Sequence, residues 1–105
     1  MQIQINSDNH VKIDSASGTA IEGDIQRILG RFAGYLTRVE IHLSDLDANK
    51  SGIRDKRCQM EARPAGRQPV SVSADAASVD QAVRDAAEKM KRALDTAWGR
   101  ASEVR

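Results

Sequence analysis

Three segments of alternating polar and apolar residues lie in the second half of the chain, and one long amphipathic segment follows them. In residues 38–44, 57–63 and 70–74 every second residue is apolar, which places the apolar side chains on one face of a strand. Over residues 79–97 the apolar residues recur at three- and four-residue spacings, as on one side of a helix. A chain in which three segments of strand alternation are followed by one segment of helical spacing is expected to fold as a sheet covered by a helix.

The first half adds one strand and one helix. Residues 2–6 alternate in the same way, and residues 17–36 carry a helical stripe that consists of Ile21, Ile25, Ile28, Leu29 and Phe32. The polar stretch 45–55 predicts an exposed loop, and Pro64-Ala65-Gly66 predicts the turn of a hairpin. The expected fold is therefore α+β, a β-α-β-β-β-α two-layer sandwich in which two helices cover one face of a four-stranded sheet. The other face of the sheet is left open to solvent or to a partner.

The last helix has recognisable ends. Ser78 and Gln81 fit a capping box, in which the serine hydroxyl accepts from the Gln81 backbone and the glutamine side chain returns a bond. Gly99 is expected to end the helix. Its apolar stripe consists of Val79, Val83, Ala86, Ala87, Met90, Leu94 and Ala97.

Length and composition limit the function classes. With 105 residues, 40% of them hydrophobic and 30% charged, the chain is expected to be a single domain, residues 1–105, with an ordered core at about 2–98. No apolar stretch approaches the roughly 20 residues of a membrane span, and no secretory leader is recognisable, so a cytoplasmic protein is expected. The single cysteine, Cys58, excludes a disulfide framework and a zinc-type cysteine pair. Neither a cofactor nor a metal is expected.

The net charge of +1 conceals an uneven distribution. Residues 1–49 sum to −3, residues 50–67 to +4 and residues 84–105 to +2. Basic residues gathered on part of a nearly neutral domain suit a phosphate-bearing or acidic partner. A solvated hairpin with scattered arginines is the alternative interpretation.

One pattern suggests a metal site and fails on closer reading. Asp45, Asp47 and Asn49 have the spacing of a calcium loop, but Lys50 replaces the loop glycine and Lys56 replaces the final glutamate. No phosphate-binding glycine motif, HExxH sequence or separated acid pair is found, so an enzyme is not expected.

Cys58 alternates with apolar residues, so a buried packing role is favoured over that of a nucleophile. A nucleophile needs a base, and of the two histidines, His10 and His42, the latter points away from the core face. His42 belongs to a polar row on two neighbouring strands. An ion-pair lattice is favoured for this row over a ligand-binding face. Its members are Arg38, Glu40, His42, Arg57, Gln59, Glu61 and Arg63. Trp98 is expected to pack under the end of the helix and not to stack on a base.

The basic residues are the strongest functional candidates. Lys89 and Arg92 are three residues apart on the last helix, and the remaining candidates lie on it or on the adjoining hairpin: Arg84, Lys91, Lys56, Arg57, Arg63 and Arg67. A shared positive surface on such a module suits the phosphates and 2′-hydroxyls of structured RNA. An ordinary solvated helix face remains the alternative.

Two segments carry a family resemblance. RFAGYLTRVEIHLSD and SVDQAVRDAAEKMKRAL resemble the ribosome hibernation-promoting factors, also called ribosome-associated inhibitor or sigma-54 modulation proteins. The similarity runs from Ile3 to about Trp98, and its helix signature consists here of Ala82, Val83, Lys89, Met90, Arg92 and Leu94. The chain departs from the family at residues 96–98, where members commonly carry further lysines, and it has no extension of the long-form type.

The resemblance implies a fold similar to the double-stranded-RNA-binding domain and a short-form protein that binds the small ribosomal subunit. Such proteins occupy the mRNA and tRNA channel and silence translation under stress or slow growth, without catalysis. By similarity, Lys89 and Arg92 would contact rRNA phosphates. The expected partners are the small subunit and its rRNA, with neither a membrane nor a small-molecule substrate. The alternative is a protein-interaction module that modulates a regulator or an enzyme through the polar sheet face.

Overall fold

The computed structural model describes residues 1–8, 11–46 and 55–99. Its elements follow the order expected from the sequence: β1 (Gln2–Ser7), α1 (Ser15–Leu29), β2 (Leu36–Asp45), β3 (Lys56–Pro64), β4 (Val70–Ala76) and α2 (Val79–Leu94). A 3₁₀ turn, Gly30–Phe32, follows α1, and a π-helical turn, Asp95–Gly99, continues α2.

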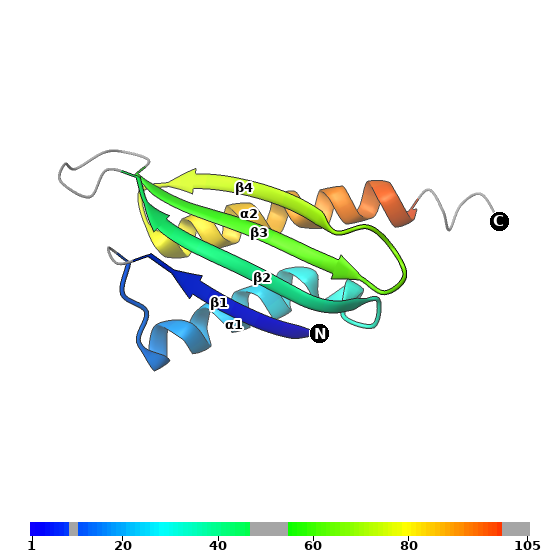
Figure 1. Ribbon diagram of the computed structural model, residues 1–105, viewed down its shortest axis with the longest axis horizontal. Coiled ribbons are helices and arrows are strands. Elements are labelled where there is room, and N and C mark those ends of the chain that lie inside the picture. The colour runs from blue at the N-terminus through cyan, green and yellow to red at the C-terminus, as the bar shows by residue number, and fades with distance from the viewer. Residues whose placement is uncertain (9–10, 47–54, 100–105) are drawn as a thin grey trace.

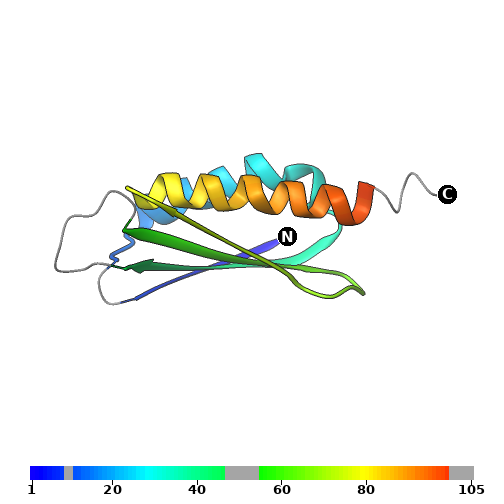
Figure 2. The same ribbon diagram turned by 90° about the horizontal axis from the view of Figure 1, so that it is seen from above.

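The strands lie in the sheet in their chain order, β1-β2-β3-β4. β1 is parallel to β2, and the two remaining pairs are antiparallel. Figure 1 shows both helices crossing the same face of the sheet, and the turned view in Figure 2 shows that the opposite face is uncovered. The two-layer α+β sandwich is confirmed.

Alternation along each strand places the apolar side chains between the sheet and the helices. Across the sheet, Ile5 pairs with Ile41, Ile41 with Met60 and Met60 with Val72. Ile41 and Met60 are each only 1% exposed, and the predicted stripe of α1 is buried from Ile21 to Phe32. The inward faces predicted for β2 and β3 are therefore confirmed.

The first helix is shorter than its stripe predicted, because it ends at Leu29 and not at Leu36. Gly30, which disfavours helix, opens a 3₁₀ turn, and Leu36 is buried as the first residue of β2, opposite Pro64. At the other end, the Asp14 carboxylate accepts from the Ser17 backbone at 2.8 Å, and this bond lowers the pKa of Asp14.

The last helix agrees with its predicted start and departs in two details. The Ser78 hydroxyl accepts from the Gln81 backbone at 3.2 Å, but the Gln81 side chain donates to Asp85 at 2.7 Å and does not return the bond. The reciprocal half of the capping box is therefore wrong, because a carboxylate one turn away is the stronger acceptor. Ala97 was wrongly assigned to the buried stripe: it is exposed, because the π-helical turn after Leu94 changes the angular position of the residues that follow.

Candidate nucleic-acid interface

The eight basic candidates do not form one surface. Arg57 and Arg63 lie on the uncovered face of the sheet, and Lys56 lies at its end, beside Asp45. Arg67 belongs to the β3–β4 turn, and the other four candidates lie on α2. Figure 2 shows both helices on one side of the sheet, so the cations of α2 belong to the layer opposite the open face that carries Arg57 and Arg63.

Acidic neighbours engage the arginines of the open face. Arg57 donates to both carboxylate oxygens of Asp75, at 2.8 and 3.1 Å, and this pairing raises the pKa of Arg57. Arg63 lies 2.9 Å from Glu61 and 3.8 Å from Glu40, which also pairs with Arg38 at 3.2 Å. The predicted ion-pair lattice is confirmed, and it leaves this face nearly balanced in charge.

Lys56 is also held by acids. Its ammonium lies 3.0 Å from Asp55 and 3.4 Å from Asp45, and the hydrogen bond to Asp55 is the main cause of the raised pKa of Lys56. Asp45 thus pairs with a lysine, and the other two positions of the calcium-like pattern, 47 and 49, lie outside the described residues. No cluster of metal-binding side chains occurs within the described ranges.

Arg84 and Lys91 lie on the side of α2 that faces α1. Arg84 reaches Asp24 of α1 at 3.6 Å, and Asp95, further along the same side, pairs with Arg31 at 2.9 Å. Lys91 is seven residues, or two turns, after Arg84, so it belongs to the same row. Within the described part of the chain no acid pairs with the Lys91 ammonium.

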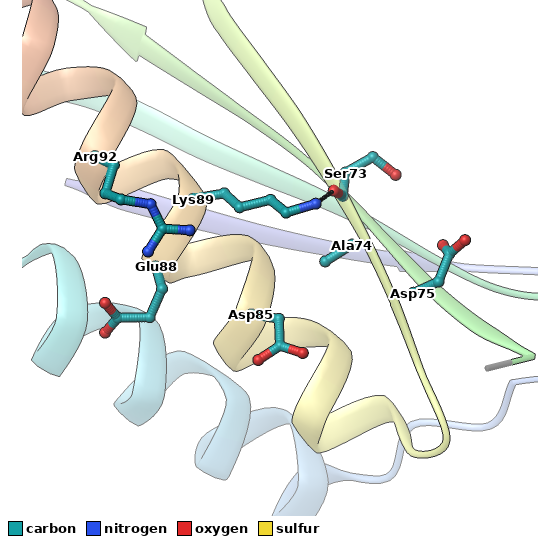
Figure 3. Close-up of a pocket in the computed structure, with 7 residues that line it drawn as sticks. All are labelled: Ser73, Ala74, Asp75, Asp85, Glu88, Lys89 and Arg92. Atoms are coloured by element: carbon teal, nitrogen blue, oxygen red, sulfur yellow. Dashed lines mark hydrogen bonds between the residues drawn. The ribbon is translucent and has the colours of Figure 1, made fainter. Parts of the chain in front are cut away.

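Lys89 and Arg92 lie on the other side of α2, where a groove of about 560 Å³ separates the helix from strand β4. Its lining consists of Ser73, Ala74, Asp75, Asp85, Glu88, Lys89 and Arg92 (Figure 3). The Lys89 ammonium donates to the Ser73 carbonyl at 2.8 Å and so ties the helix to the strand. Arg92 is exposed and has no ion pair among the residues described.

The sequence identified the two cations of this groove but missed its acids. Asp85 precedes Lys89 by four residues and Glu88 precedes Arg92 by four, which is a helical spacing that the sequence contained as a signal. Asp75 arrives from β4, and only the pairing of strand and helix brings it to the groove. The groove is therefore mixed in charge, and the free positive charge lies toward its Arg92 end.

Cys58 lies in the core and not at a site. It is 0% exposed, and burial raises the pKa of its thiol to about 12. His42 is exposed on the opposite face of the sheet, and His10 lies outside the described residues. A thiol with so high a pKa, and with no histidine beside it among the residues that the structure describes, is a poor nucleophile, which supports the packing role.

No helix in the described ranges combines the length and apolar character that crossing a membrane requires. The side chain of Trp98, like residues 47–54, lies outside the described part, so its predicted packing is not tested.

Comparisons with known proteins identify a family for this chain and solved structures with the same fold. A family model described as sigma 54 modulation protein / S30EA ribosomal protein matches residues 3–101. The crystal structure of the Thermus thermophilus Protein Y N-terminal domain superposes with a TM-score of 0.71 at 18% identity, covering 91% of this chain and 98% of that chain. A ribosomal subunit interface protein from Coxiella burnetii superposes with a TM-score of 0.75 at 16% identity, covering 94% and 99%. The curated proteins that were searched contain no match.

Proposed function

Because the chain belongs to the sigma 54 modulation protein / S30EA ribosomal protein family, we propose that it associates with ribosomes in the cytoplasm and lowers their activity. In the finer form of this proposal, the protein binds the small subunit and occupies the mRNA and tRNA channel under stress or slow growth. It acts by steric exclusion, as a rigid body held by electrostatic contacts, and catalyses no reaction. The family match over residues 3–101 is the observation that carries the proposal.

The pairing of cations with acids indicates which surface of the protein is available to rRNA phosphates. On the open sheet face and at the sheet end, Arg57, Arg63 and Lys56 are paired with carboxylates, and an rRNA phosphate would have to displace an acid to reach them. Lys91 and Arg92 are not paired in this way within the described residues. We therefore assign the main anchor to the second half of α2, with Lys89, Lys91 and Arg92 as its cations.

These cations suit phosphates for a second reason. Lys89 and Arg92 are one turn apart, and Lys91 lies on the adjoining side, so the helix presents positive charge over a broad arc. Rows of cations on a helix position a protein on the RNA backbone without reading its sequence. Arg84 and Arg67 are supplementary candidates, one at the start of the Lys91 row and the other in the β3–β4 turn.

Sedimentation with separated ribosomal subunits at two salt concentrations tests the proposal. We expect the protein to migrate with the small subunit at low salt and to dissociate steeply as salt rises. Lys89→Gln combined with Arg92→Gln removes two phosphate contacts, which should weaken binding by about tenfold or more and reduce the salt slope by about two. Glutamine keeps an amide donor at position 89.

A matched control removes the same charge elsewhere. Lys12→Gln with Arg27→Gln also lowers the net charge by two, at exposed positions before and within α1. This variant should bind within about twofold of the parent, since long-range attraction is screened beyond roughly 10 Å. If both double variants lose equal affinity, or neither loses any, α2 is not the anchor.

A second function is favoured by a different feature. A hollow of about 540 Å³ lies on the open face, and its lining includes Asn6, His42, Gln59, Glu61 and Ser73. A charge-balanced surface with many hydrogen-bonding groups suits a protein partner better than RNA. Ribosome binding that is lost on His42→Ala with Gln59→Ala and depends weakly on salt would favour this protein-docking function.

A further inference from the structure

Strand β4 has a free edge. It is the last strand of the sheet, and no other strand lies beyond it in the described part of the chain (Figure 1). The Ser73 carbonyl is bonded by the Lys89 ammonium at 2.8 Å, so it points away from β3. In an antiparallel pair the N–H and C=O of one residue point to the same side and alternate along the strand, so Ser71, Ser73 and Asp75 present their backbone groups outward. Such an edge is a template for another strand.

The acids and cations of α2 beside this edge form a palindrome of opposite charge. From residue 85 to residue 92 the sequence reads DAAEKMKR, with acids at Asp85 and Glu88 and cations at Lys89 and Arg92. About the midpoint between Glu88 and Lys89, the two acids that line the groove mirror its two cations, whereas Lys91, which is not a lining residue of the groove, mirrors the uncharged Ala86. A second helix laid antiparallel about that midpoint would place Asp85 opposite Arg92 and Glu88 opposite Lys89.

The strand has its own midpoint at the same level. Ser73 is the central residue of β4, which runs Val70–Ala76. Lys89 adjoins the midpoint of the charge palindrome, and its ammonium contacts Ser73 directly (Figure 3). One two-fold axis passing near Ser73 and Lys89 therefore serves both the strand and the helix, which is the condition for a self-complementary interface.

We propose that the groove between β4 and α2 binds a second copy of this chain. The two β4 strands pair antiparallel about Ser73, so that Ser71 faces the partner's Asp75 and the two four-stranded sheets join. Val70 and Val72, which are only half-buried on the helix side of β4, become covered by the same strand of the second copy. The Lys89 ammonium leaves the Ser73 carbonyl for Glu88 of the other copy, and the backbone N–H of the partner's Ser73 takes its place.

The proposal is independent of the proposed ribosome function, because it rests only on the edge and on the charge order. In the dimer two of the groove's three acids, Asp85 and Glu88, face cations of the second copy, whereas Asp75 pairs with Arg57 of its own chain. Where the proposed function holds as well, the second copy and rRNA compete for Lys89 and Arg92.

A charge-reversal pair tests the interface. In Glu88→Lys, the ammonium introduced at position 88 repels Lys89 of the second copy, and in Lys89→Glu the introduced carboxylate repels Glu88 of the second copy in the same way. We expect each single variant to weaken self-association at low salt by about tenfold or more, because two symmetric contacts change sign. In an equimolar mixture of the two variants, every 88–89 contact joins a lysine to a glutamate, so mixed dimers should form.

Sedimentation equilibrium of the full chain measures the average mass of the parent, each variant and the mixture, and circular dichroism checks their fold. Ser73→Pro is the second variant: it deletes the outward N–H without removing a bond to β3, and should also weaken the dimer. Dimers in the parent, monomers in the single variants and dimers in their mixture support the proposal. A parent that stays monomeric at about 1 mM, or a dimer that tolerates Glu88→Lys and Ser73→Pro, overturns it.

Discussion

The thiol of Cys58 gives a direct test of whether this residue packs or reacts. Burial raises the pKa of Cys58 from 9.0 to about 12, and the side chain is 0% exposed. At pH 8 the thiolate fraction of an unperturbed cysteine is about 0.1, whereas a pKa of about 12 lowers it to about 10⁻⁴. We therefore expect the folded protein to react with a thiol reagent at least about a thousandfold more slowly than the urea-unfolded chain.

The same shift predicts how stability depends on pH. The pKa of Cys58 in the folded state lies above its value in the unfolded state, because burial disfavours the thiolate. The contribution of the buried neutral thiol to the free energy of unfolding is therefore fully present below about pH 9. It is lost as the pH rises from about 9 toward 12, and about 1.4 kcal/mol of it is lost by pH 10. Urea unfolding at pH 8 and pH 10 should show this loss in the parent and not in Cys58→Ala.

Rapid modification of the folded protein at pH 8 would refute the reasoning. It would mean that the thiol is accessible and ionised, as a nucleophile would be. Equal pH dependence in the parent and in Cys58→Ala would refute the linkage separately, because other groups would then cause the loss.

Two further predictions concern the fold. Ile41→Ala should lower the free energy of unfolding by about 2–5 kcal/mol, whereas the neighbouring His42→Ala on the open face should change it by less than about 0.5. Urea unfolding measures both variants, and the dependence of the free energy of unfolding on urea concentration should be unchanged. Similar losses of free energy at both positions would contradict the assigned inward face of β2. Ser78→Ala should cost about 1 kcal/mol and Ser78→Asp much less, since aspartate also accepts from the Gln81 backbone. If Ser78→Asp lowers the free energy of unfolding as much as Ser78→Ala does, the Ser78 hydroxyl does not stabilise the protein as a helix cap.

Most of the fold follows from local patterns in the sequence. Period-two alternation identified the strands because a sheet covered on one face buries every second side chain, as at Val39, Ile41 and Leu43. The end of α1 was misplaced because a hydrophobic stripe continues through Phe32 and Leu36, and periodicity alone does not separate a helix from the turn and strand that follow.

The candidate site was less predictable, since its character depends on contacts between distant residues. Composition marked Arg57 and Arg63 as cations, but only the pairing of β3 with β2 and β4 shows that Glu40 and Asp75 neutralise them. The groove beside Lys89 likewise requires α2 to lie along β4, an arrangement that no local pattern specifies.

The sheet order has a consequence for how the chain acquires its structure during synthesis. α1 and β1 emerge first, yet the apolar sides of both are covered only when later elements arrive. α2, the last of the labelled elements, packs against α1, β3 and β4. Stalled chains that end before α2 should accordingly remain sensitive to protease, and chains that expose all of α2 should become resistant. Synthesis must therefore carry α2 beyond the exit tunnel before β3 and β4 gain their cover, and the core is completed in one late step.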